Sequence, residues 1–279
     1  MWDALTVEEA GYTRRAIEAL SSKRWARLLL HRVELAGGVT ASAKPLLFEV
    51  RYAHELLLAG VTPEYERAAG VGNSTVEFRI PGDPEWLVEL VSLRESEALR
   101  ASTHERGSRS ARLLWTGSPD RRQSEEGEMI KAEERIVEKV FSSGRPTKFP
   151  PPRDGAIHLV LADMRGYLGY GGDEIDYAQM ALGEAGVPRE RAHDVHCWEK
   201  EGKLVPIAGL FEECNPLPAA QLVRERIHFL GFVAEREYRE GEIRDTAYHL
   251  ANPHLFADED AAERAFLSYP LAPKRRRRR

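Results

Sequence analysis

The fold is decided by residues 62–96, which read TPEYERAAGVGNSTVEFRIPGDPEWLVELVSLRES. The alternation and the β-branched side chains predict three strands in quick succession: VTPEYERA, STVEFRI and EWLVELVSL. A glycine-bearing loop, AAGVGN, separates the first two strands, and the turn PGDP separates the last two. Apolar residues lie on both faces of the third strand, which is typical of a central strand covered on both sides.

Two of these strands carry a carboxylate among apolar residues, namely Glu77 in STVEFRI and Glu89 in WLVELVSL. Burying a charge without a partner is costly, so strongly apolar strands rarely contain one. Another group should therefore compensate the two charges. A divalent cation held between the two strands is one candidate.

The segment before the strands, residues 42–60, is predicted to be a helix that begins at Ser42 and ends at Gly60. At about 100° per residue, Glu49 falls on its apolar, core-facing stripe, whereas Glu55 points the other way and is expected to be a surface charge. The full stripe consists of Leu46, Glu49, Ala53, Leu56, Leu57 and Gly60. Glu49 is therefore a third carboxylate that faces the core.

The segments after the strands continue the pattern. Residues 97–123 are polar and arginine-rich and are predicted to be a long mobile loop. Residues 124–144 are predicted to be a helix capped by Ser124 and ended by Gly144, and AIHLVLADM (156–164) a buried strand. The order is therefore helix, three strands, helix, strand.

This αβββαβ order, with a glutamate on the first helix and carboxylates in strands two and three, resembles the PD-(D/E)XK or restriction-endonuclease-like nuclease superfamily. The resemblance covers residues 42–164. It implies an α/β fold with a central mixed sheet flanked by helices, preceded by an N-terminal helical extension and followed by a C-terminal α+β elaboration. It also implies that Glu49, Glu77 and Glu89 are the catalytic residues and hold Mg²⁺, or Mn²⁺, for the hydrolysis of DNA.

The chain departs from that family pattern at two positions. Val76 precedes Glu77 where the family often has Pro-Asp, and Val91 stands where a lysine is expected two residues after Glu89. In the family that lysine helps to position or activate the attacking water. Lys131 on the second helix is a candidate replacement, although it lies off the core-facing stripe; Gln123 and Glu126 are better placed but chemically different.

Two functions follow from these observations. One is a metal-dependent nuclease, and the alternative is a catalytically inactive, nuclease-like module that interacts with nucleic acid or protein. The carboxylates also have a purely structural interpretation, in which Glu77 and Glu89 pair with arginines such as Arg79 and Arg94. Three carboxylates that converge on one point repel one another unless a cation neutralises them, so the metal-site hypothesis predicts that their side chains meet.

A histidine- and cysteine-bearing segment invites a zinc interpretation. His193, His196 and Cys197 lie close in sequence, and Cys214 is a potential fourth ligand. Their spacing matches no standard zinc module, so solvated loop histidines are the expectation.

Composition sets outer limits on function. The 279-residue chain is 42% hydrophobic and 30% charged, and its net charge of −5 argues against a general polyanion binder. The sequence ends in Lys274 followed by the five arginines 275–279, which predicts a solvated tail or a weak, salt-sensitive attraction to nucleic acid.

Domain organisation and location are expected as follows. Residues 1–41 are an N-terminal helical extension, 42–165 a nuclease-like core, 166–270 a C-terminal elaboration of the same sheet or a small second lobe, and 271–279 a basic tail. No apolar stretch is long enough to span a membrane, and the two cysteines argue against a disulfide scaffold, so a cytoplasmic location is expected. The oligomeric state is open, with a homodimer as one option.

Overall fold

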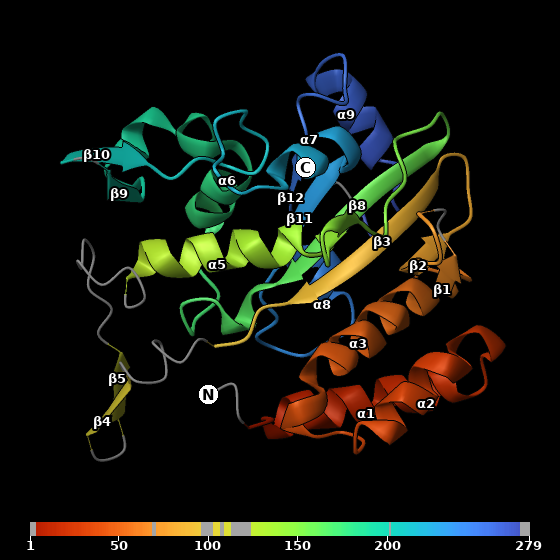
Figure 1. The fold of residues 1–279 in the computed structure, drawn as a ribbon. Coiled ribbons are helices and arrows are strands. Elements are labelled where there is room, and N and C mark those ends of the chain that lie inside the picture. The colour runs from red at the N-terminus through yellow and green to blue at the C-terminus, as the bar shows by residue number, and fades with distance from the viewer. Residues whose placement is uncertain are drawn as a thin grey trace, which may run out of the picture.

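A computed structural model of the 279-residue chain shows an α/β fold, in which helices cover both faces of a six-stranded mixed sheet (Figure 1). The structure describes residues 4–68, 71–95, 103–106, 109–112, 124–200 and 202–273.

The central sheet has the strand order β1-β2-β3-β8-β11-β12. Neighbouring strands are antiparallel from β1 to β3, parallel from β3 through β8 to β11, and antiparallel again at β12. The bounds are β1 Glu64–Ala68, β2 Thr75–Ile80, β3 Glu85–Ser92, β8 Ala156–Asp163, β11 Phe229–Val233 and β12 Tyr248–Ala251. The three strands predicted in residues 62–96 are therefore confirmed, and the C-terminal part of the chain adds two strands to the same sheet.

The third strand is central, as its sequence predicts. Every residue of β3 from Glu85 to Val91 is buried, because helices pack on both faces of the sheet. Its side chains alternate between two hydrophobic clusters: Leu87 and Val91 face one, and Trp86 and Val88 face the other.

Helices pack on both faces of the sheet. On the side of the cluster that contains Trp86 and Val88, α3 Lys44–Leu58 packs against β3, and α1 Val7–Ser21 and α2 Arg27–Leu35 pack against α3. Residues of α8 Glu242–Thr246 and α9 Glu259–Phe266 pack with the same cluster. On the opposite side lie α5 Glu125–Val137, α6 Glu174–Leu182 and α7 Ala220–Arg226.

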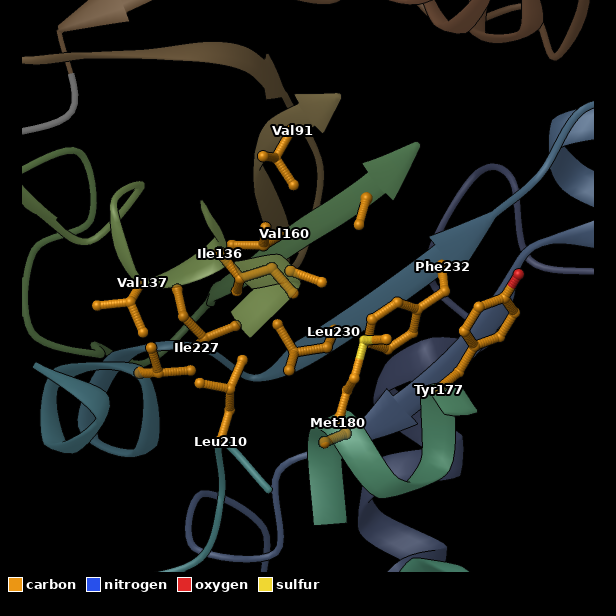
Figure 2. Packing of buried hydrophobic residues seen from close by; sticks show 14 of the residues in the cluster. Val91, Ile136, Val137, Val160, Tyr177, Met180, Leu210, Ile227, Leu230 and Phe232 are labelled. Atoms are coloured by element: carbon orange, nitrogen blue, oxygen red, sulfur yellow. The ribbon is translucent and has the colours of Figure 1, made fainter. Parts of the chain in front are cut away.

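Figure 2 shows the cluster on the α5 side of the sheet. Ile136 of α5 lies over Val160 of β8, and Met180 of α6 packs close to Phe232 of β11. The packing of Ile136 on Val160 holds α5 against the sheet, and this fixes the position of the residues that follow the helix.

Smaller elements complete the described chain. They include two-stranded sheets and short helices at the periphery, among them a β4–β5 hairpin inside the segment predicted to be one long loop. Their bounds are η1 Arg24–Ala26, η2 Ala41–Ala43, β4 Thr103–Arg106, β5 Arg109–Arg112, β6 Phe141–Ser142, β7 Arg145–Pro146, η4 Met164–Gly166, η5 Gly183–Gly186, η6 Arg189–Asp194, β9 Cys197–Lys200, β10 Lys203–Pro206, α8 Glu242–Thr246 and α9 Glu259–Phe266. The rest of 97–123 and the basic run 274–279 lie outside the described residues. No helix in the described part is long and apolar enough to cross a bilayer.

Helix α3 differs from its prediction at its start and in its burial. It begins at Lys44 without a side-chain cap, so Ser42 is not its cap. Every residue from Leu47 to Leu56 is buried. Glu55 is only 2% exposed and accepts a hydrogen bond of 2.6 Å from the backbone of Gly241, so its prediction as a surface charge is wrong. Arg51 is also buried, and it pairs with Glu235. The reason is that α1 and α2 pack against α3, as does α8, and these contacts cannot be read from the periodicity of α3 alone.

Candidate active site

Glu77 and Glu89 lie together at the point where β2 and β3 separate. The regular pairing of the two strands runs from Ile80 opposite Trp86 to Phe78 opposite Val88. Beyond it, side chains make the connection: the Glu77 amide donates to Glu89 Oε1 at 2.9 Å, and the Leu90 amide donates to Glu77 Oε2 at 2.5 Å. The two carboxylates are thus inserted between the strands, and both belong to one site.

Two lysines neutralise this pair. Lys139, just after α5, places its Nζ 2.9 Å from Glu77 Oε1 and 3.2 Å from Glu89 Oε2. Lys148, after β7, has its Nζ 3.3 Å from Glu89 Oε1. The arginine partners considered from the sequence are wrong: Arg79 pairs with Glu64 and Glu85 instead.

Arg94 also differs from its predicted role as a salt-bridge partner. Within the part of the chain that the structure describes, it makes no ion pair with Glu77 or Glu89. It lies instead on the wall of the cleft beside them.

Glu49 reaches the same place from α3. Its Oε2 accepts a hydrogen bond of 2.5 Å from the Tyr65 hydroxyl, and the Arg32 guanidinium lies 3.7 Å from the same oxygen. Glu49 and Glu77 line one cleft of about 760 Å³ together with Lys139. Glu89, fully buried, lies against Glu77 through the contacts described above. Glu49 and Glu77 therefore line the same cleft, and Glu77 is bonded to Glu89. The predicted convergence of all three carboxylates on one ion stays a prediction.

The electrostatics of the cluster follow from burial and repulsion. Burial and the neighbouring charge of Glu77 raise the pKa of Glu49 to about 8, although Tyr65, Arg32 and Lys139 oppose the shift. The same two causes raise the pKa of Glu89 to about 7 against the attraction of the two lysines. Burial alone would lower the pKa of Lys139, but Glu77 and Glu89 outweigh it and raise the pKa.

The fit to a metal ion can be judged from these contacts. Carboxylate oxygens are the ligands that Mg²⁺ and Mn²⁺ prefer, and the repulsion between Glu49 and Glu77 is what a bound cation would relieve. However, among the described residues no group of three or more His, Cys, Asp or Glu side chains is arranged to hold an ion. The Lys139 ammonium lies where the cation between the strands is predicted. Metal binding by Glu49, Glu77 and Glu89 therefore stays a prediction, and it requires Lys139 to move aside.

The replacement lysine predicted from the sequence is not the one at the site. Lys131 is 40% exposed and pairs with Glu128 at 2.7 Å. Gln123 lies outside the described residues, and Glu126 lines a different cleft. Lys139 was not identified as a site residue from the sequence. It lies three residues after Ile136, beside the end of the apolar stripe of α5. A lysine at the end of a buried stripe was the available signal.

The histidine and cysteine segment forms no zinc site within the described residues. His196 bonds to Asp176 at 2.9 Å, and Cys197 donates to the Val195 carbonyl. Cys214 is exposed on its own. The expectation of solvated loop histidines is wrong for His196, whose side chain is only 13% exposed.

Comparisons of the chain with protein-family models, with curated proteins and with solved structures give no match. The interpretation of the cleft therefore depends on its own residues.

Proposed function

We propose that the chain is a metal-dependent nuclease that hydrolyses DNA phosphodiester bonds in the cleft between α3, β2 and the residues after α5. The observation that carries the proposal is the pair Glu77 and Glu89, held between two separating strands with the ammonium of Lys139 bridging them. The restriction-endonuclease-like family uses two acidic side chains and a lysine for phosphodiester hydrolysis; there the lysine lies on a strand, whereas Lys139 lies between α5 and β6.

The order of elements supports the same proposal. Helix α3 precedes the antiparallel strands β1, β2 and β3, and α5 then leads to β8, which is parallel to β3. This is the αβββαβ order that the resemblance implies. The glutamates lie on the three elements that the family pattern predicts: Glu49 on α3, Glu77 on β2 and Glu89 on β3.

The chemistry can be assigned to residues. A bound Mg²⁺ or Mn²⁺ would supply positive charge beside the phosphate and make a water molecule more acidic. Glu49, Glu77 and Glu89 would hold that ion. Lys139, whose Nζ lies between Glu77 and Glu89 in this structure, would be displaced by the ion and could then donate a hydrogen bond to a substrate phosphate or to the attacking water. In this proposal Lys139 fulfils the role of the lysine absent at Val91.

Positively charged residues at the cleft suit a phosphate backbone. Arg94 and Arg135 line the cleft beside Glu77 and Lys139. Arginine contacts to phosphate position a nucleic acid without reading its sequence. These two side chains are therefore proposed to hold the strand on either side of the scissile bond.

One observation favours the alternative, an interaction module without catalysis. Both oxygens of Glu77 and both oxygens of Glu89 already have donors within the protein. Carboxylates that are satisfied in this way can be retained for folding alone.

A cleavage assay separates the two functions. Supercoiled plasmid and single-stranded DNA are incubated with wild type, Glu77→Ala and Glu89→Ala in Mg²⁺, Mn²⁺ or Ca²⁺. Cleavage is expected with Mn²⁺ above Mg²⁺, binding without cleavage with Ca²⁺, and loss of cleavage in both variants. Glu64→Ala, which removes a half-exposed glutamate from the neighbouring strand β1, is the matched control and should cleave like wild type. Equal background cleavage by all proteins, with DNA binding intact, would identify a binding module.

A further inference from the structure

A second cleft of about 630 Å³ lies at the beginning of α5, away from the proposed nuclease site. Its walls come from the first turn of α5, from the start of α6 and from the loop that leads into β9. Its lining is rich in acid: the carboxylates are Glu125, Glu126, Asp173, Asp176 and Asp194.

Side-chain contacts fix the far wall of this cleft. The buried amide of Gln179 clamps the backbone of His196, since it donates to the carbonyl and accepts from the N–H, both at 2.8 Å. The ring Nε2 of His196 then lies 2.9 Å from Asp176 Oδ1, and Asp176 Oδ2 accepts from the Asp173 amide. These contacts satisfy Asp176 and hold His196 in one orientation.

Glu126 is different, because it is buried without a donor. It is 8% exposed, and its Oε2 has no hydrogen-bond partner in the described part of the chain. Glutamates in the first turn of a helix are favoured by the helix dipole, which explains why the charge is tolerated there. The dipole does not supply the missing donor, and a buried carboxylate oxygen without one is uncommon in folded proteins. Glu126 therefore has the capacity to bind a hydrogen-bond donor from outside.

The charge of the cleft selects a positive donor. Among the described residues that line the cleft, Arg191 is the one with a permanent positive charge, and its guanidinium is already bonded to Asp194. Burial raises the pKa of Glu125, and the charges of Asp176 and Glu126 act in the same direction while His196 opposes them. Tyr170, with 58% of its surface exposed, lines the same cleft and offers an aromatic face to a cation.

We propose that this cleft binds an organic cation through an ammonium or guanidinium group, with Glu126 accepting its hydrogen bond and Tyr170 covering its face. The proposal does not depend on the nuclease function. It gives a role to Glu126 and Tyr170, which the proposed nuclease site does not use.

The test is isothermal titration of the full-length protein with agmatine, which carries one guanidinium and one ammonium group. We expect saturable binding of one agmatine per chain. The affinity should stay the same when KCl replaces the buffer salt at the same ionic strength. Glu126→Gln should weaken binding about tenfold, since it removes a charge-assisted hydrogen bond. Tyr170→Ala, at an exposed position, should also weaken it.

The matched control is Glu134→Gln, which neutralises an exposed glutamate on the same helix and should bind like wild type. Thermal unfolding of Glu126→Gln establishes that the variant is folded. The proposal is overturned if agmatine gives no saturable binding, if Glu126→Gln and Tyr170→Ala bind as wild type does, or if Glu134→Gln weakens binding as much as Glu126→Gln.

Discussion

The backbone amide of Glu77 donates a hydrogen bond of 2.9 Å to the side chain of Glu89. In a continuous antiparallel ladder that amide would donate to a carbonyl of the partner strand. Here a carboxylate takes the carbonyl's place, so the strands part and the acidic oxygens are inserted between them. The proposed site is consequently part of the hydrogen bonding of the sheet, and changes at Glu77 or Glu89 should affect both folding and activity.

Lys139→Met should destabilise the metal-free protein. The substitution leaves Glu77 and Glu89 facing each other with only Lys148 nearby, and breaking a buried ion pair from one side costs about 3 kcal/mol. Urea unfolding in the presence of a chelator measures the loss. A saturating divalent cation should restore part of it, because an ion can then occupy the place of the ammonium.

The matched control is Lys131→Met, which removes a partly exposed lysine from the preceding helix. Its free energy of unfolding should change by less than about 1 kcal/mol, because exposed ion pairs contribute little. If the two variants lose the same free energy of unfolding, the contacts of Lys139 with Glu77 and Glu89 contribute no more than an exposed ion pair. That result would weaken the case for the site.

The strands and their carboxylates could be predicted because their signals are local. Alternation, the turn PGDP and the cap at Ser124 each lie within a few residues, and the structure has β2, β3 and the start of α5 where they indicate. The predicted end of that helix at Gly144 is wrong, because α5 ends at Val137 and the strands β6 and β7 follow. The pairing of the lysines with the glutamates could not be found in this way. Lys139 and Lys148 lie at least 50 residues from Glu89, after the helix and in a proline-rich connection, and only the tertiary fold brings them to it.

The full burial of α3 could not be predicted from the sequence either. A periodic stripe identifies one buried face of α3, but a second layer of helices buries the other face, where Glu55 lies. Charged residues on that face, such as Arg51, then pair with distant partners instead of solvent. Local periodicity contains no information about such a layer.

Divalent cations should raise the melting temperature of wild type if the three glutamates bind an ion. At a free concentration 100 times the dissociation constant, the gain is about 2.7 kcal/mol by mass action. Glu49→Gln should reduce the shift, because Glu49 is the ligand whose charge is balanced least directly by lysine. Differential scanning calorimetry with Mn²⁺ and with Mg²⁺ measures this, and Glu64→Gln serves as the control. An equal shift in all three proteins would place the ion elsewhere.

Deleting residues 274–279 should weaken DNA binding without slowing the chemical step. This basic run lies outside the described residues, so the expectation depends on its charge alone. Contacts between arginine and phosphate release counterions, so the loss of affinity should be large at low salt and small at high salt. Fluorescence anisotropy over a salt series measures the slope, and single-turnover cleavage measures the chemical step. A salt-independent loss of affinity would mean that the tail acts through folding.

The pH dependence of stability should reveal the protonation of Glu49. Its folded-state pKa is about 8 against an ordinary value of 4.5, so between these values the folded protein keeps a proton that the unfolded chain releases. The contribution of Glu49 to stability is therefore complete below pH 4.5 and is lost as the pH rises through 8. The loss has a slope of at most about 1.4 kcal/mol per pH unit. Glu89, with a pKa of about 7, acts in the same direction over a narrower range.

Glu49→Gln isolates this contribution, because the amide resembles the protonated acid and does not titrate. Urea unfolding of both proteins at pH 5, 6, 7 and 8, in the presence of a chelator, gives the difference at each pH. Wild type should lose stability relative to Glu49→Gln as the pH rises. A saturating concentration of Mn²⁺ should flatten the dependence if the ion binds the ionised glutamate, because the ion then competes with the proton. Parallel curves without metal would show that Arg32 and Lys139 already hold Glu49 ionised at neutral pH. Its charge would then be balanced within the protein, which would contradict its proposed role as a metal ligand.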